Sequence, residues 1–133
     1  MSDAVYLGNP NLKKANTSIS FTKEQVEEFI NCKDNPVYFA KNYVKIISLD
    51  EGLVPFEMYD FQEKLIENFH NNRFNIAKLP RQTGKSTSAA GYLLWYAMFI
   101  PDSTILVAAH KYAGAQEIMQ RVRYAYESVP NHI

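Results

Sequence analysis

The spacing of apolar residues predicts two short helices near the start of the chain, after a stretch with no periodicity. Residues 1–21 form that stretch and predict an irregular lead-in. Thr22 and Gln25 match a capping box, and apolar residues at helical spacing follow them. Pro36 favours the first turn of the second helix, where its missing N–H would have no helical acceptor.

The pattern next predicts a hairpin and a third helix. Residues 44–49 and 53–58 have strand character, and Asp50-Glu51-Gly52 between them is typical of a turn. Asp60 and Glu63 match a second capping box in front of an apolar helical face. We therefore interpret Asp50 and Glu51 as residues of a hairpin turn and not as a metal-binding motif.

The second half of the chain alternates between strand and helix periods. Strands are expected at residues 74–79 and 104–109, and helices at 85–99 and 112–128. This alternation is typical of the α/β class, in which helices flank a parallel sheet. We therefore expect one domain with a parallel sheet, preceded by a helical lead-in and a β-hairpin.

Composition limits the possible classes of protein. The chain has 133 residues, 47% of them hydrophobic, and a formal net charge of zero, so any contact with nucleic acid must come from local basic patches. The single cysteine, Cys32, excludes an internal disulfide and fits a reducing compartment. The start lacks a secretion signal, and the longest apolar run, 89–100, is short of the ~20 residues that cross a bilayer. These features predict a soluble intracellular protein without a membrane partner.

The segment LPRQTGKST, residues 79–87, carries the candidate chemistry. Gly84, Lys85 and Ser86 match the end of a phosphate-binding loop, G-x-x-x-x-G-K-[ST], while Leu79 stands where the first glycine is usual. A predicted strand runs into this loop and a predicted helix begins at Lys85, which is the arrangement that phosphate binding needs. Lys85 is expected to contact the β- and γ-phosphates, and the Ser86 hydroxyl to bind Mg²⁺.

Other loop residues complete the predicted nucleotide site. Backbone amides of Gln82, Thr83 and Gly84 are expected to point at phosphate, and Thr87 follows them at the helix start. The guanidinium of Arg81 could stabilise charge on the γ-phosphate during catalysis. The alternative is that Arg81 is a solvated loop residue.

With these motifs the chain resembles the large terminase subunit of tailed bacteriophages, nearest to the contractile-tailed type. The resemblance runs from about Pro36 to Pro130 and includes YFAKNYVKIISLDEGLVPFEMYDFQEKLIENF, NRFNIAKLPRQTGKST and AAGYLLWY. That family has a deviant phosphate loop with an early basic residue and no first glycine. It implies a P-loop NTPase fold of the additional-strand type.

The resemblance also implies a function and partners. The family is an ATP- and Mg²⁺-dependent motor that packages double-stranded DNA in the host cytoplasm, as a ring oligomer with portal protein and the small terminase subunit. Residues 22–133 would be the N-terminal part of its ATPase domain. The acidic motifs and the nuclease domain would follow Ile133, so that this chain alone would hydrolyse ATP poorly. The alternatives are a helicase-like translocase and a docking module that no longer uses nucleotide.

The family's adenine-recognition element matches Tyr59, Phe61 and Gln62. A carboxamide can donate to and accept from the adenine edge, and an aromatic ring can stack on it. The alternative places Phe61 in the core and Gln62 on the surface of a helix. Near the chain end, the segment His110-Lys111-Tyr112 and the residues Arg121 and Arg123 are candidates for DNA contact. The alternative is that their charges are solvated.

Overall fold

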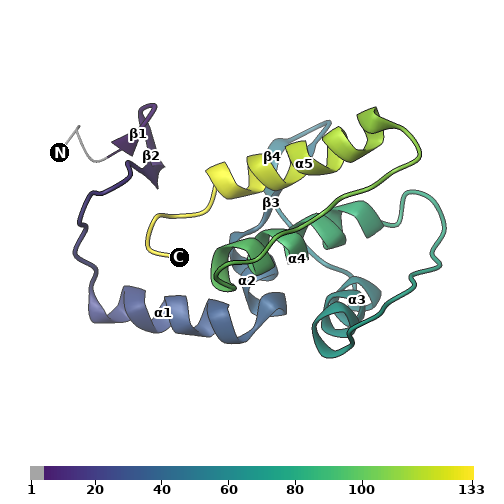
Figure 1. The fold of residues 1–133 in the computed structure, drawn as a ribbon, viewed down its shortest axis with the longest axis horizontal. Coiled ribbons are helices and arrows are strands. Elements are labelled where there is room, and N and C mark those ends of the chain that lie inside the picture. Colours follow the sequence, from purple (N-terminus) through teal and green to yellow (C-terminus); the bar gives the residue numbers. More distant parts are fainter. Residues whose placement is uncertain (1–4) are drawn as a thin grey trace.

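The computed structural model describes residues 5–133 and shows a mixed fold of helices and short strands (Figure 1). The elements in chain order are β1 (Val5–Tyr6), β2 (Asn9–Lys13), α1 (Lys23–Asp34), α2 (Pro36–Tyr43), β3 (Lys45–Ser48), β4 (Gly52–Pro55), α3 (Asp60–Asn71), α4 (Lys85–Phe99) and α5 (Tyr112–Glu127). No helix within this described range is long and apolar enough to cross a membrane.

The predicted helices are confirmed, together with most of their caps. The Thr22 hydroxyl accepts from the Gln25 amide, and the Gln25 side chain accepts from the Thr22 amide, which is the capping box in front of α1. Asn35 caps α2 with its side-chain oxygen, and Pro36 occupies the first turn as expected. Local sequence signals therefore place these helix starts.

The predicted hairpin is confirmed as β3 and β4, which pair antiparallel with Lys45 opposite Pro55 and Ser48 opposite Gly52. Gly52 has a φ of 74°, which a glycine adopts without strain. Asp50 and Glu51 are exposed in the turn, as their interpretation as hairpin residues requires.

The core lies where α4 crosses the other helices. Packed together there are the buried side chains of Cys32, Phe39, Ala40, Val44, Phe56, Ile66, Leu94, Trp95, Phe99, Ala125 and Val129. Phe39 meets Phe99 edge-on, with ring centroids 5.5 Å apart. Trp95 donates its indole N–H to the Cys32 carbonyl at 2.7 Å, so its one polar group is satisfied inside the core. These contacts hold α4, and therefore the loop that precedes it, against α1 and α2.

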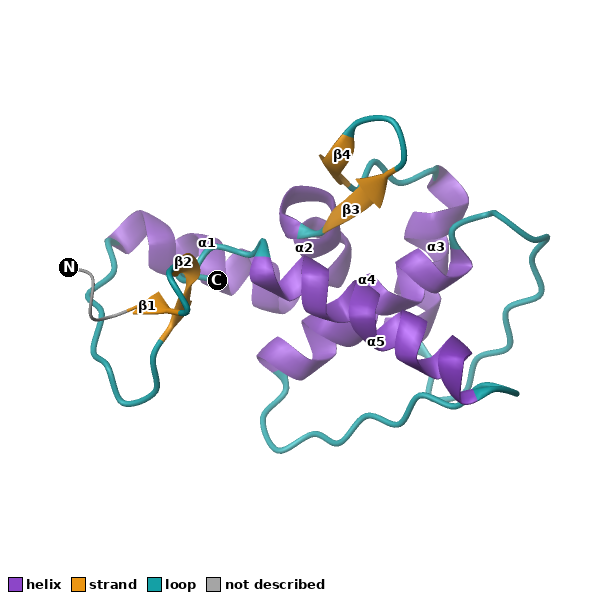
Figure 2. Cartoon of the chain, turned by 90° about the horizontal axis from the view of Figure 1, so that it is seen from above, coloured by secondary structure: helices purple, strands orange, loops and turns teal. Residues whose placement is uncertain are grey.

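The expected parallel sheet is not formed by the described residues, whose ladders are all antiparallel. Residues 74–79 and 104–109 run as extended connections on either side of α4 without ladder partners (Figure 2). Ile105 and Val107 are partly buried, while Leu106 is 90% exposed. An apolar run thus produces an extended segment, but a strand also needs a neighbour to share its hydrogen bonds.

The lead-in differs from the expected irregular segment, because β1 and β2 form a small antiparallel hairpin. Leu7 and Gly8 both have positive φ in the turn, which is typical of a tight hairpin. Asn9 and Asn11 each donate a side-chain N–H to the carbonyl of Glu127, the last residue of α5. The hairpin therefore caps the end of a helix that lies far away in sequence.

Candidate phosphate site

The segment before α4 folds into a compact turn over residues 81–84. Gln82 and Gly84 have φ values of 60° and 74°, in the left-handed region. The Thr83 hydroxyl donates to the Pro80 carbonyl at 2.9 Å and closes the turn from inside. When φ alternates between positive and negative values along the chain, successive N–H groups turn toward one side. A phosphate-binding concavity is built in this way.

Helix α4 begins at Lys85 with Gly84 as its N-cap. The first amides of a helix have no intrahelical acceptor, and within residues 5–133 those of Lys85, Ser86 and Thr87 donate to no other group. The positive end of the helix dipole adds to their attraction for an anion. Ser88, which is fully buried, instead donates its hydroxyl to the Gly84 carbonyl and fixes the first turn.

The Lys85 ammonium lies across this turn. Its Nζ donates to the Leu79 carbonyl at 2.9 Å, so the side chain folds back over the loop and stays half-buried. A lysine at a helix start would otherwise extend into water, where its charge is best solvated. The loop therefore presents an ammonium group beside free backbone amides, a combination suited to a phosphate anion.

Gln62 supports the loop from α3. Its carboxamide oxygen accepts from the Tyr59 amide at 2.9 Å, and its Nε2 donates to the Thr83 carbonyl at 3.0 Å. The side chain is only 4% exposed, so its interpretation as a surface helix residue is wrong. The helix start also lies one residue earlier than the predicted capping box, because Gln62 and not Glu63 bonds the cap.

The remaining predicted contact residues are accessible around the loop. Tyr59 and Phe61 are exposed and stack on each other with centroids 5.8 Å apart and an interplanar angle of 9°. The alternative that places Phe61 in the core is therefore wrong, whereas the adenine role of these two rings and of Gln62 stays a prediction. Arg81 and Ser86 are exposed, the first in the turn and the second on the first turn of α4.

One contact at the loop was not expected from the sequence. Arg121 on α5 donates from Nη1 to the Thr87 hydroxyl at 2.9 Å and from Nη2 to the Glu117 carboxylate at 2.9 Å. The only sequence signal was the spacing of Glu117 and Arg121, which places them on adjacent turns of one helix face. Arg121 is thus held at the start of α4 instead of being a free surface charge.

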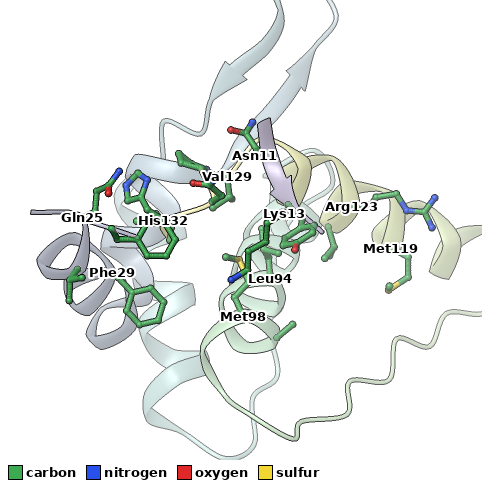
Figure 3. A pocket seen from close by; sticks show the side chains of 18 residues that line it. Asn11, Lys13, Gln25, Phe29, Leu94, Met98, Met119, Arg123, Val129 and His132 are labelled. Atoms are coloured by element: carbon green, nitrogen blue, oxygen red, sulfur yellow. The ribbon is translucent and has the colours of Figure 1, made fainter. Parts of the chain in front are cut away.

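A separate cavity of about 820 Å³ lies between α1, α4, α5 and the end of the chain (Figure 3). Phe29, Leu94 and Met98 give it apolar walls, and Lys13 and Arg123 contribute positive charge. No acidic side chain and no residue of the loop 79–87 lines it. His132 is the lining side chain suited to acid–base chemistry, but no second such group accompanies it and the phosphate motif lies elsewhere, so the loop is the better candidate site.

The chain as a whole matches no protein-family model. Within residues 5–133, no group of three or more His, Cys, Asp or Glu side chains is placed to hold a metal ion. The chemistry of the site therefore consists of backbone amides, the Lys85 ammonium, the Arg81 guanidinium and the Ser86 and Thr87 hydroxyls. Such a set can bind a phosphate chain by charge and hydrogen bonds.

Proposed function

We propose that this chain is the ATP-binding portion of a DNA-packaging motor of the terminase large-subunit type. The observation that carries the proposal is that the Lys85 Nζ folds back over the turn, and that the first amides of α4 donate to no group of the described residues. A triphosphate would replace the Leu79 carbonyl as the acceptor of this ammonium group. Gly84 adopts the left-handed backbone of this turn without strain.

The residues present fit Mg-ATP in specific roles. Gln82, Thr83 and Gly84 would offer amides, Lys85 and Arg81 positive charge, and Ser86 a hydroxyl for Mg²⁺. The ion, when bound, would neutralise phosphate charge and orient the phosphates. The exposed rings of Tyr59 and Phe61 are available to the base.

The proposal is tested by titrating the folded protein with a fluorescent ATP analogue in the presence of Mg²⁺. Lys85→Ala removes one charge-assisted contact and is expected to weaken binding about 10-fold to 100-fold. Lys78→Ala is the matched control, because Lys78 is an exposed lysine of the same connection that lies outside the turn. It is expected to change the affinity little.

Equal binding by the wild type and Lys85→Ala would contradict the proposal. A well-folded wild type without affinity for the analogue would instead favour a docking module that does not use nucleotide. The contact of Gln62 with the loop is also compatible with a helicase-like translocase. Stimulation of ATP hydrolysis by double-stranded DNA, compared with single-stranded DNA, separates that candidate from a packaging motor.

A further inference from the structure

The contact between Arg121 and Thr87 joins α5 to the start of the phosphate helix. The two residues are 34 positions apart in sequence, and their side chains meet because α5 packs along α4 (Figure 1). Thr87 stands on the first turn of α4, directly after Lys85 and Ser86. No other hydrogen bond between side chains of the described residues joins α5 to α4.

Within residues 5–133, the Thr87 hydroxyl has one hydrogen-bonding position that is not used. A hydroxyl can accept two hydrogen bonds and donate one. Here it accepts from Arg121, and none of the hydrogen bonds of residues 5–133 uses its proton. A positively charged donor on the oxygen polarises the O–H bond and makes the proton a better donor.

The Arg121 guanidinium is held in place by a second contact. Glu117 lies one helical turn earlier on α5 and accepts from Nη2 at 2.9 Å, while Nη1 reaches Thr87. The fork of the guanidinium therefore bridges the two elements with a fixed direction. Arg123, two residues later, lines the 820 Å³ cavity instead and has no such role.

We propose that Arg121 is a positioning residue for the phosphate site, which holds and polarises the Thr87 hydroxyl and so couples nucleotide binding to the packing of α5 on α4. This inference rests on the proposed function. A phosphate that accepts the Thr87 proton strengthens the Arg121 contact, and by linkage the contact strengthens phosphate binding by the same factor. Occupancy of the loop is thereby transmitted to α5 at Glu117 and Arg121.

The size of the effect is limited by solvent. The Arg121 side chain is 43% exposed, so the contact is screened and its loss leaves no buried charge behind. Loss of one such hydrogen bond corresponds to a threefold to tenfold loss of affinity, in the range of about 1 kcal/mol for a typical protein hydrogen bond. Arg121→Met keeps an unbranched apolar stem and removes the guanidinium, and it is expected to fold as the wild type does.

The test is a double-mutant cycle on affinity for the fluorescent ATP analogue. Arg121→Met and Thr87→Val should each weaken binding about threefold to tenfold, and the double variant should lose little more than either single one. Arg123→Met, the matched control, should bind as the wild type does. Additive losses in the double variant would overturn the inference.

A second readout does not depend on affinity or activity. At saturating nucleotide, amide hydrogen exchange over residues 112–121 should slow in the wild type and in Arg123→Met, and should not slow in Arg121→Met. If exchange in Arg121→Met slowed as much as in the wild type, and if its affinity for nucleotide were that of the wild type, the coupling would be wrong. This outcome leaves the proposed function intact as long as Lys85→Ala still weakens binding. A folded wild type that does not bind the ATP analogue at all would instead contradict the proposed function itself.

Discussion

Gly84 carries two constraints at one position. Its φ of 74° lies in the left-handed region, and a Cβ added there would collide with the Gln62 side-chain nitrogen. The same nitrogen donates to the Thr83 carbonyl, so the space under the loop is already used. A glycine is therefore needed for the support of the loop as well as for its turn.

This constraint yields a prediction with an internal control. Gly84→Ala combines backbone strain with a clash and is expected to destabilise the fold by about 1–3 kcal/mol and to weaken nucleotide binding. Gly91, also on α4, has room for a Cβ, whose nearest neighbour would be Val44 at 3.8 Å. Gly91→Ala should stabilise the helix by about 0.5–1 kcal/mol. Urea unfolding measures both, and equal effects of the two variants would contradict the account.

The sequence predicts the loop at residue scale because its signals are local. Gly84 and Lys85 stand next to each other, and the turn chemistry between them and Pro80 is decided within a few residues. The Arg121 contact could not be predicted in this way, because it depends on how two helices pack. The burial of Gln62 also depends on how elements pack. It was missed because a polar residue at a helix start is usually exposed.

At the scale of elements, one carboxylate joins α1 to α2. Glu28 accepts hydrogen bonds from the Tyr43 hydroxyl at 2.7 Å and the Tyr38 hydroxyl at 2.8 Å. These bonds lower the pKa of Glu28 below its ordinary value. The pKa of the Tyr43 hydroxyl is raised, mainly by burial and secondly by its hydrogen bond to Glu28. The ionised acid with neutral phenols is therefore the state that the fold favours.

The pH dependence follows from the signs of these shifts. A lowered carboxyl pKa adds stability above the unfolded value of about 4.3, and this stability is lost as the pH falls further. Raised tyrosine pKa values add stability that is present below about pH 10 and lost above it. Urea midpoints should therefore fall toward both pH 3 and pH 11. Glu28→Gln should reduce the fall of the urea midpoint at low pH. The control Glu27→Gln, which removes no bond to a tyrosine, should leave that fall unchanged. Identical profiles of the two variants would contradict this prediction.

The elements themselves were predicted unevenly, for a physical reason. The helices were predictable because caps such as Thr22 and Asn35 and the apolar faces behind them act within a few residues. The hairpin β3–β4 was predictable because its turn and both strands are contiguous. A parallel ladder joins distant segments, and the apolar run 104–109 alone does not specify a partner. The hairpin in the lead-in depends on docking to Glu127, which no local pattern reveals.

At the scale of the whole molecule, the two extended connections expose large apolar side chains. Ile76 is 99% exposed and Leu106 is 90% exposed, and Phe74 is similarly open. These segments also carry backbone groups that are in no ladder within the described residues. Open apolar edges of this kind are templates for pairing with another chain.

We therefore expect concentration-dependent self-association of the isolated protein. Replacing Ile76 and Leu106 by Lys should shift it toward the monomer, because a charge on an open edge opposes pairing. Leu49→Lys is the control, since Leu49 is equally exposed but lies at the β3–β4 turn. Sedimentation velocity over a range of concentrations measures the effect. A wild type that stays monomeric throughout would contradict the expectation.

The indole buried beside Cys32 gives the protein a native optical probe. Trp95 is the single tryptophan of the chain, and it lies on α4, the helix that follows the candidate phosphate loop. Its emission will be blue-shifted while the helices enclose it and will move to longer wavelength when water reaches the ring. Any disturbance of the loop that propagates along α4 can therefore be followed by intrinsic fluorescence, without a dye attached to the chain.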